Sequence, residues 1–455
     1  MRLSLDQILG ATGGRQTGGA PREEFGSYHT DSREVRAGGL FFALRGAEAD
    51  GHAFVADAVG RGAGGVIVER PVEVPGPLGP LVVVQVADTW RALYDLAGWV
   101  LERVSPAVVG ITGSNGKTST KEMVAAVLAV RHRVHRTAGN LNTETGLPLT
   151  VLELSPEHEV AVLEMGMQGP GEIARLAALA RPTVGVVTGV GSVHAEFFPD
   201  GREGIARAKG DLVRALPAHG LAVLNAEDTY FGVLSALSAA PVVGFGLDAG
   251  DLRGESYRPL AAGGSELVVE GVRTRVGPSG RHQALNALAA LAVGRFLGVP
   301  VAQSAPALAT VAVKHRLEEH RFPSGYVLVD DSYNASPESM LAAFDTVAER
   351  PREGRLLALL GEMRELGSLA PEAHERVGRH ARELFDRVAV IDVGEGRRLA
   401  EAAGAELLPD RAAGAAWVRG SAGPGDVVLV KASHGVALHE VVEQLVAEQP
   451  EAPAQ

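Results

Sequence analysis

The ten residues from Gly110 to Ser119, GITGSNGKTS, constrain the fold of this chain more than any other segment. The apolar run at 107–111 predicts a strand just before them, and residues 121–130 predict a helix just after them. Glycines let backbone N–H groups converge on phosphate oxygens, and the start of a helix adds its positive dipole end. A strand, a glycine-rich turn and a helix in this order are the setting of a phosphate-binding loop.

Two side chains at the end of this segment fit the same interpretation. Lys117 would neutralise charge on the β- and γ-phosphates, and the Thr118 hydroxyl would lie near Mg²⁺. The match to the generic pattern G-x-x-x-x-G-K-[ST] is imperfect, because Ile111 stands where the first glycine is expected. The alternative is a glycine-rich turn with a solvated lysine. The flanking strand and helix favour the nucleotide loop.

Short apolar strands alternate with amphipathic helices along most of the chain. This pattern fills residues 106–313 and 314–445, and it predicts parallel sheets covered by helices on both faces. The proline-rich segment 71–80 predicts a loop, and the polar tail is expected to fray. The predicted fold class is α/β with three domains: a small N-terminal α/β domain at 1–85, a central parallel-sheet P-loop ATPase domain at 86–313, and a C-terminal Rossmann-like α/β domain at 314–455.

Charge and composition exclude several classes of function. The 43 Lys and Arg residues against 55 Asp and Glu residues give a net charge of -12, which argues against nucleic acid as a partner. The chain has no cysteine, so a metal ion would bind carboxylate, hydroxyl, imidazole or water, as Mg²⁺ does. We find no secretory signal and no apolar run of about 18 residues. We therefore expect a cytoplasmic protein without a membrane span.

The form that the phosphate loop takes here, G-x-T-G-x-N-G-K-T, resembles the ATP loop of the Mur ligase superfamily. Further motifs follow in order across nearly the whole chain, and together they resemble the branch that joins D-alanyl-D-alanine to the UDP-muramoyl-tripeptide of peptidoglycan. The resemblance implies that ATP and Mg²⁺ activate a carboxylate as an acyl phosphate, which the amine of the dipeptide then attacks. It also implies that the three domains bind the UDP-substrate, ATP and the amine substrate. We expect a monomer.

Two motifs resemble the parts of this family that bind the UDP-linked substrate. The run DSREV at 31–35 assigns Ser32 and Arg33 to the uridine diphosphate, although by itself it would also suit a solvated turn. The run TAGNLNTETGLP at 137–148 resembles the substrate loop. The resemblance assigns Asn140, Asn142 and Thr143 to the substrate, with Thr143 standing where the family usually has a second asparagine.

Metal binding is assigned to four residues in separate motifs. A carboxylate at the end of the apolar strand 160–163 would suit Mg²⁺ held between ATP and the protein, which points to Glu164. The lysine that matches Lys209 is often carbamylated in this superfamily, which turns a cation into a carboxylate-like ligand. Gly189 replaces the asparagine that usually precedes the histidine motif. The resemblance assigns the metal to Thr118, Glu164, His194 and Lys209; without it, the last two would be ordinary surface or core residues.

The remaining nucleotide contacts are assigned to the second half of the chain. The Asn286 amide can pair with an adenine edge, with His282 lining the same pocket. Arg316 would reach the γ-phosphate when the domains close. The assigned nucleotide-binding residues are Gly113, Asn115, Gly116, Lys117, Thr118, Ser119, His282, Asn286, Arg316 and Asp331, and the assigned catalytic residues are Lys117, His194, Lys209 and Arg316.

The segment DDSYNASPESM at 330–340 is the most discriminating motif of this branch. It assigns Asp331 to the ribose or a phosphate, and Tyr333 and Asn334 to the incoming dipeptide. The later segments GEMRELG at 361–367 and KASHG at 431–435 also resemble the branch, and they assign Lys431 and Ser433 to the substrate. The departures from the family pattern are Ser336 for Asn, Glu362 for Asp and His434 for Arg.

Two alternatives remain open at this stage. A sibling ligase that adds a single amino acid, or a ligase that polyglutamylates folate, would share the phosphate loop. A folate enzyme would not explain the first domain or the motif at 330–340. A nucleotide-binding relative without ligase activity belongs to a different class, and nucleotide binding without turnover would identify it.

Overall fold

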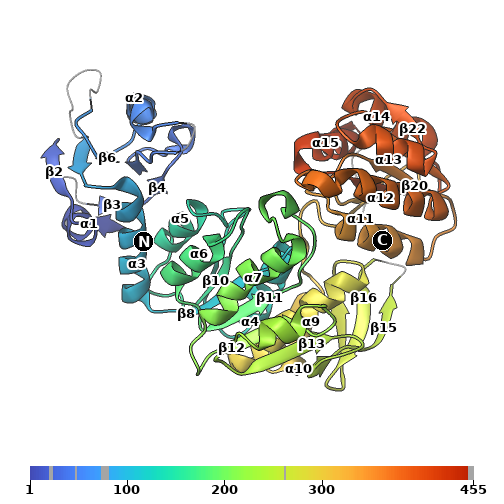
Figure 1. Ribbon diagram of the computed structural model, residues 1–455, viewed down its shortest axis with the longest axis horizontal. Helices are drawn as coiled ribbons and strands as arrows, with labels where there is room; N and C mark the ends of the chain where they lie inside the picture. The colour runs from blue at the N-terminus through green and yellow to red at the C-terminus, as the bar shows by residue number, and fades with distance from the viewer. Residues whose placement is uncertain (20–23, 47–48, 73–80, 261–262, 449–455) are drawn as a thin grey trace. The chain divides into compact units, whose positions relative to one another are not determined.

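The computed structural model describes residues 1–19, 24–46, 49–72, 81–260 and 263–448 (Figure 1). Most of the predicted loop at 71–80 and the end of the predicted frayed tail, at 449–455, lie outside these ranges. The chain divides into two compact units. The first contains residues 1–110, 132–166 and 174–183, and the second contains residues 111–131, 167–173 and 184–455.

The first unit begins with a five-stranded sheet in the order β2-β7-β6-β5-β4. Its strands from β4 to β7 are parallel, and β2 pairs antiparallel with β7 at the edge. Phe41, Val66 and Val83 of the sheet pack with Val55 and Ala58 of a short helix to form its core. The elements of this part are β1 (Leu3–Ser4), α1 (Leu5–Thr12), β2 (Arg15–Gly18), β3 (Glu24–Phe25), β4 (Tyr28–His29), β5 (Leu40–Phe42), α2 (Val55–Gly60), β6 (Gly65–Val68) and β7 (Val82–Gln85).

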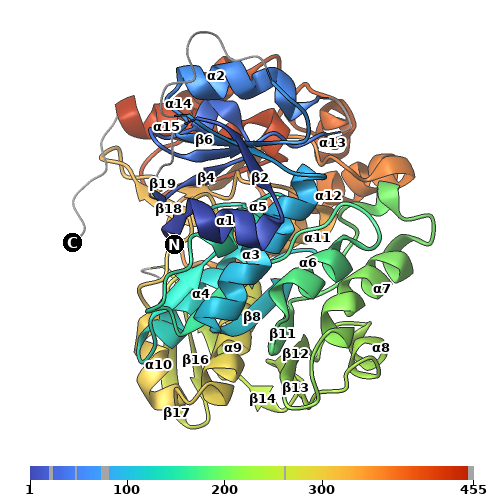
Figure 2. The ribbon, with the colours of Figure 1, turned by 90° about the vertical axis from the view of Figure 1, so that its left-hand side faces the viewer.

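Helix α3 (Thr89–Val104) leads out of this sheet and packs against α1 (Figure 2). It begins at Thr89 because the Asp88 carboxylate caps it, accepting a hydrogen bond from the backbone N–H of Arg91 at 2.9 Å. Leu93, Leu96 and Val100 recur three or four residues apart and are fully buried, as expected for one face of an amphipathic helix.

A seven-stranded sheet in the order β14-β13-β12-β11-β8-β10-β9 follows. Strands β9 and β10 belong to the first unit, β11 to β14 belong to the second, and the boundary runs through β8. All five residues of β10 are buried, which is typical of a parallel strand covered on both faces and confirms the predicted central parallel sheet. The elements are β8 (Ala107–Thr112), α4 (Lys117–Ala129), β9 (Val134–Arg136), α5 (Gly146–Leu152), β10 (Val160–Glu164), α6 (Glu172–Ala180), β11 (Val184–Val187), α7 (Gly201–Arg214), β12 (Leu221–Asn225), α8 (Phe231–Ser235), β13 (Val242–Gly246) and β14 (Leu252–Arg253).

The second unit also contains a three-stranded antiparallel sheet that the sequence did not predict. Its strands β15 (Glu255–Pro259), β16 (Ser265–Val269) and β17 (Val272–Val276) lie in that order. Residues alternate between buried and half-buried positions along β16, so one face packs inward and the other faces outward. Helices α9 (Arg281–Phe296) and α10 (Val301–Leu308) follow and pack on this sheet and on α4.

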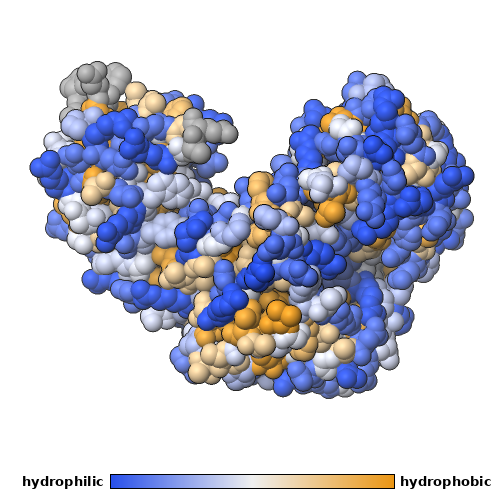
Figure 3. Space-filling model, in the orientation of Figure 1, coloured by the Kyte–Doolittle hydropathy of each residue, from blue (hydrophilic) through white to orange (hydrophobic). Residues whose placement is uncertain are grey.

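The C-terminal sheet has the order β18-β19-β23-β20-β21-β22, and only β18 among these strands is antiparallel. Its apolar residues point alternately to two cores, one under α11, α12 and α13 and the other under α14 and α15. Figure 3 shows a mostly hydrophilic surface over α12 and α13, where exposed ion pairs such as Arg398–Glu375 lie. The predicted Rossmann-like domain is confirmed, with an added antiparallel edge strand. The elements are β18 (Glu318–Arg321), β19 (Val327–Asp330), α11 (Pro337–Glu349), β20 (Leu356–Leu360), α12 (Ala370–Leu384), β21 (Arg387–Ile391), α13 (Gly396–Ala403), β22 (Glu406–Leu408), α14 (Arg411–Ser421), β23 (Val427–Lys431) and α15 (Leu438–Glu448).

Throughout the described part of the chain, no helix combines the length and the apolar character that crossing a membrane requires.

Candidate active site

The phosphate loop connects β8 to α4, as the sequence predicts. Gly116 caps the helix with a positive φ of 81°, a conformation that side chains disfavour. The Lys117 ammonium turns back over the loop and donates hydrogen bonds to the carbonyl oxygens of Gly113 at 2.8 Å and Ser114 at 3.4 Å. A lysine folded over its own loop is positioned to exchange these carbonyl oxygens for phosphate oxygens.

The segment that follows β11 holds this loop in place through hydrogen bonds. The backbone N–H of Ser114 donates to the Gly189 carbonyl at 2.9 Å, and its hydroxyl accepts from the N–H of Gly191 at 2.8 Å. Gly113 has φ 153°, and a Cβ there would lie 1.8 Å from Oγ1 of Thr188. The loop therefore depends on a glycine at 113 for both backbone conformation and space.

A pocket of about 260 Å³ opens beside the loop within the second unit. Of the residues assigned to the nucleotide, the loop members Asn115, Gly116 and Ser119 line it, together with residues far away in the sequence. It thus joins the phosphate loop, the start of α9 and the segment after β19 in one cavity. The distant lining residues with an assigned role are His282, Asn286, Arg316, Asp331 and Lys431.

The start of α9 approaches the phosphate loop closely. A Cβ on Gly116 would lie 2.7 Å from Oδ1 of Asn286, so glycine at 116 allows the Asn286 amide to reach the loop. The amide also donates to Gln283 at 3.1 Å. Burial lowers the pKa of the neighbouring His282 to about 4, so its ring is neutral at pH 7. Neutral imidazole and amide groups suit a base edge better than charged groups would.

A buried ion pair also lines the pocket. The Lys431 ammonium, whose side chain is 1% exposed, lies 2.5 Å from a carboxylate oxygen of Asp331 and donates to the Asn334 carbonyl at 2.9 Å. Burial lowers the pKa of Lys431, and the Asp331 carboxylate opposes that shift. These contacts hold the segment after β19 against the end of β23. Lys431, assigned to the substrate, therefore lies in the nucleotide pocket.

Arg316 connects the pocket to the residues assigned to the dipeptide. Its guanidinium carbon lies 4.4 Å from the centre of the Tyr333 ring, in a cation–π contact. On the same ring, the His434 imidazole lies 5.6 Å away, centre to centre. The Asn334 amide oxygen accepts from the N–H of Ala335, and the Ser433 hydroxyl accepts from the N–H of Arg364 at 2.8 Å. Asn334 and Ser433 thus shape the loops on which they lie.

Two residues assigned to the metal lie elsewhere in the second unit. Lys209, on α7, is 2% exposed, and burial together with the nearby charge of Lys117 lowers its pKa well below the usual value. A neutral buried amine is the form that reacts with CO₂ to give a carbamate, which would supply a carboxylate-like ligand. His194 has φ 67°, and its Nδ1 lies 2.6 Å from a carboxylate oxygen of Glu365.

The donors assigned to the metal in this unit are the Thr118 hydroxyl, the His194 imidazole and the Lys209 nitrogen. A hydroxyl and a carbamate are hard ligands that suit Mg²⁺, whereas an unmodified Lys209 ammonium would repel it. The residues present therefore fit Mg²⁺ if Lys209 is carbamylated.

A second group with metal-ligand chemistry was not predicted. His315, Glu318 and Asp330 place possible ligand atoms within 4.8 Å of one another. These atoms, however, are already engaged in contacts within the group. The Nδ1 atom of His315 lies 2.6 Å from Asp330, and Glu318 accepts from the N–H of His315 at 2.9 Å. The group connects the segment before β18 to the end of β19.

The first unit holds the other predicted residues. The Asn142 amide donates to Oε1 of Glu164 at 2.7 Å, so a residue assigned to the substrate orients one assigned to the metal. Arg33 lies in a turn after Asp31 and pairs with its carboxylate at 2.6 Å, which lowers the pKa of Asp31. Ser32 is buried, and Asn140 and Thr143 are exposed.

Sequence reasoning missed several residues that line the nucleotide pocket. Asp228 lies just past the end of β12 and accepts a hydrogen bond from the N–H of Val190 at 2.7 Å. Glu338 accepts from the N–H of Ser192 at 3.1 Å and from its hydroxyl at 2.7 Å. Residues at the carboxyl ends of parallel strands commonly face the ligand, so the position of Asp228 after an apolar strand was a usable signal.

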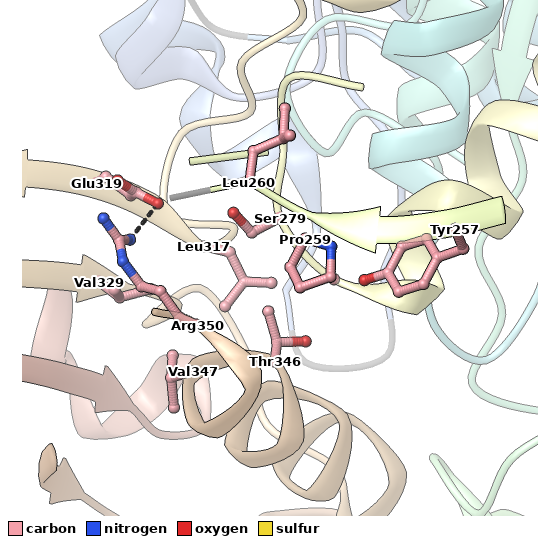
Figure 4. A pocket seen from close by; sticks show the side chains of 11 residues that line it. Tyr257, Pro259, Leu260, Ser279, Leu317, Glu319, Val329, Thr346, Val347 and Arg350 are labelled. Atoms are coloured by element: carbon pink, nitrogen blue, oxygen red, sulfur yellow. Dashed lines mark hydrogen bonds and ion pairs between the residues drawn. The ribbon is translucent and has the colours of Figure 1, made fainter. Parts of the chain in front are cut away.

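A smaller pocket lies where the antiparallel sheet meets α11 (Figure 4). Tyr257 and Leu317 line it, and an ion pair between Glu319 and Arg350 lies at one side. Its walls are largely apolar, and no residue assigned from the sequence lines it. The larger pocket at the phosphate loop is therefore the candidate active site.

A phosphate loop at the end of a parallel strand, a nucleotide-sized pocket and a Rossmann-like sheet beside it define a nucleotide-using α/β enzyme. Three family patterns match the chain: the Mur ligase family catalytic domain at 25–138, the Mur ligase middle domain at 111–294 and the Mur ligase glutamate ligase domain at 315–434. The chain belongs to the Mur ligase family, whose members form amide bonds with ATP.

Curated relatives include the UDP-N-acetylmuramoyl-tripeptide–D-alanyl-D-alanine ligases of Synechocystis, 38% identical over 92% of each chain, and of Bacillus subtilis, 35% identical over 92% of each chain. Among solved structures, MurF from Acinetobacter baumannii matches with a TM-score of 0.88 and 28% identity over 98% of this chain and 99% of that chain. MurF from Thermotoga maritima in complex with ADP matches with a TM-score of 0.81 and 31% identity over 93% and 97%.

Proposed function

We propose that this chain joins D-alanyl-D-alanine to UDP-N-acetylmuramoyl-tripeptide at the expense of ATP, giving the UDP-linked pentapeptide, ADP and phosphate. The observation that carries the proposal is the pocket in which the phosphate loop meets His282, Asn286, Arg316 and Asp331. The relatives with the same substrates in their names match nearly the full chain, which supports the same choice of substrates here.

ATP binds in this pocket with its phosphates on the loop from Gly113 to Ser119. Lys117 leaves its loop carbonyls and neutralises the β- and γ-phosphates, and Arg316 approaches the γ-phosphate. Asn286 and His282 contact the base, and Asp331 contacts the ribose or a phosphate. Each of these groups positions the nucleotide or neutralises its charge, which is the main requirement of phosphoryl transfer.

Thr118, His194 and a carbamylated Lys209 are the candidates in the second unit for holding Mg²⁺, and Glu164, at the end of β10 in the first unit, is a candidate from the sequence. When bound, Mg²⁺ would neutralise charge on the transferring phosphoryl group. Carbamylation is expected because burial and the charge of Lys117 favour the neutral amine of Lys209. The modification would add 44 Da to the intact protein under conditions that retain CO₂ and would be lost on acidification.

The chemistry proceeds in two displacements. The terminal carboxylate of the tripeptide attacks the γ-phosphorus, and the bond to ADP breaks to leave an acyl phosphate. The amine of the dipeptide attacks the acyl carbon, the carbon–oxygen bond to phosphate breaks, and the amine loses a proton. Exclusion of water protects the acyl phosphate between the two steps.

The three ranges 1–85, 86–313 and 314–455 would then serve the UDP-substrate, ATP and the amine substrate. Ser32, Arg33, Asn140, Asn142 and Thr143 are the candidates for the UDP-substrate. Tyr333, Asn334, Lys431 and Ser433 are the candidates for the dipeptide side. We propose a monomer that works in the cytoplasm, where ATP and both substrates would be available.

The test is ATP-dependent phosphate release with UDP-N-acetylmuramoyl-tripeptide, with and without D-alanyl-D-alanine. Single amino acids replace the dipeptide as controls, and mass spectrometry identifies the product. We expect release that requires the dipeptide and yields the pentapeptide. Release with a single amino acid would indicate a sibling ligase instead, and ATP binding without turnover would indicate a relative that has lost ligase activity.

A further inference from the structure

Three loops of the C-terminal sheet meet at one edge. Residues 331–336 follow β19, residues 432–436 follow β23 and residues 361–366 follow β20, and the strand order β19-β23-β20 makes these loops neighbours. The helices after β19 and β20 cover one face of the sheet, whereas α15, after β23, covers the other. Ligands bind in crevices where the connections of a parallel sheet diverge in this way.

The basic side chains at this edge of the sheet are Lys431, which ends β23, and His434 and Arg364 in the loops. Lys431 is buried and committed to Asp331 at 2.5 Å. The Arg364 side chain is 46% exposed, and only its Nε is engaged, at 2.6 Å from a carboxylate oxygen of Glu362. Its two terminal nitrogens make no hydrogen bond or ion pair with residues that the structure describes.

The Arg364 guanidinium lies on a glycine of the neighbouring loop. A Cβ built on Gly435 would lie 2.0 Å from Nη1 of Arg364 and 2.8 Å from its Cζ. Gly435 is not among the glycines with positive φ, so a side chain there would meet the guanidinium without straining the backbone. The loops are fixed together, because the N–H of Arg364 donates to the Ser433 hydroxyl and the N–H of Ser433 donates to the Glu362 carbonyl at 3.0 Å.

We propose that Arg364, lying on Gly435, binds the carboxylate of the incoming amine substrate. This inference rests on the proposed function and names a residue for the recognition of its second substrate. The amine of the dipeptide becomes a neutral amide in the reaction, whereas its carboxylate stays charged throughout and favours a cation in the crevice. Two terminal nitrogens on a rigid, planar guanidinium match the two oxygens of a carboxylate. Tyr333 reaches the same crevice through its contact with His434.

The test measures steady-state kinetics with two amine substrates, D-alanyl-D-alanine and its C-terminal amide, which lacks the carboxylate charge. Arg364→Ala is expected to raise KM for the dipeptide about tenfold or more and to leave KM for ATP, for the UDP-substrate and for the amide nearly unchanged. Arg364→Lys keeps the charge but loses the two parallel N–H groups of the guanidinium. Its KM for the dipeptide is expected to lie between those of the unmodified enzyme and Arg364→Ala. The matched control is Arg379→Ala, which removes an exposed arginine of α12 that pairs with Glu375.

A second variant tests the position of Arg364 on Gly435 without removing the guanidinium. Gly435→Ala adds a methyl group where Nη1 lies, so it should displace Arg364 and raise KM for the dipeptide in the same direction. The double variant should match Arg364→Ala alone, because both changes remove one interaction. Thermal unfolding and ADP binding verify that each variant is folded.

The outcomes separate the two proposals. If the unmodified enzyme shows no dipeptide-dependent turnover, the proposed function and this inference both fail. If the unmodified enzyme is active and Arg364→Ala leaves KM for the dipeptide unchanged, only this inference fails. An equal rise in KM for the dipeptide and its amide also overturns it, because the carboxylate would then play no part.

Discussion

Glu365 places a carboxylate oxygen 2.6 Å from Nδ1 of His194, and thereby joins the loop after β20 to the loop after β11. The neighbouring His194 imidazole holds the pKa of Glu365 below its usual range. His194 itself lies at a positive φ, a backbone conformation that non-glycine residues rarely adopt. A carboxylate on one ring nitrogen leaves the other to face a ligand, as in many metal sites.

Glu365→Gln is therefore expected to weaken Mg²⁺ binding about tenfold, because an amide orients the imidazole less strongly than a carboxylate does. Calorimetric titration of Mg²⁺ in the presence of ADP measures the affinity, and the Mg²⁺ dependence of phosphate release gives a second value. Glu372→Gln, at an exposed position of α12, is the control. An unchanged Mg²⁺ affinity would show that this ion pair joins the two loops without assisting the metal.

Gly113→Ala tests the geometry of the phosphate loop. The new Cβ would meet Oγ1 of Thr188 at 1.8 Å and would force a side chain onto a φ of 153°. We expect ADP affinity to fall at least tenfold, measured by fluorescence competition, with the fold retained in circular dichroism. Gly60→Ala is the matched control, because its Cβ would meet nothing within 4 Å. Equal ADP affinity in both variants would contradict the close packing described here.

Lys431→Met would leave the Asp331 carboxylate buried without its cation. Breaking a buried pair by removing one partner costs about 3–5 kcal/mol, so urea unfolding should show a loss of that order. Adding Asp331→Asn should recover part of the loss. Lys314→Met removes a lysine that is 70% exposed and pairs with Glu443, and it should cost less than about 1 kcal/mol. Similar losses in the two single variants would be evidence against the pair as a structural support.

His282 predicts a pH dependence of stability. Its pKa of about 4 in the folded protein lies below the usual 6.5, because burial disfavours the charged ring. Between these values the unfolded chain binds more protons, so its contribution to stability is intact above pH 6.5 and falls as the pH drops toward 4. His282→Gln should lose less stability than the unmodified protein between pH 7 and 5, measured by urea unfolding at each pH. Parallel pH profiles would mean that the ring is not desolvated.

Much of the fold was predictable because fully apolar strands carry a strong local signal. The predicted strand at 107–111 is nearly all of β8, and the helix predicted at 121–130 lies in α4, which begins four residues earlier at Lys117. The antiparallel sheet was missed because alternating strands such as VRTRV at 272–276 have few apolar residues and rely on the partner strand for pairing. Strand β18, EEHR, is an edge strand of the same kind.

The sequence alone determined the class of protein. The strand, the glycine-rich loop with Lys117 and the motifs that follow each consist of residues close together in the chain, so they can be recognised without the fold. It could also name His282, Asn286 and Asp331 as separate candidates. Only the tertiary structure decided that they share one pocket, that Lys431 forms an ion pair with Asp331, and that Arg364 lies on Gly435. Lys431 and Asp331, for example, lie 100 positions apart in the sequence, and chain folding, not sequence spacing, sets their distance.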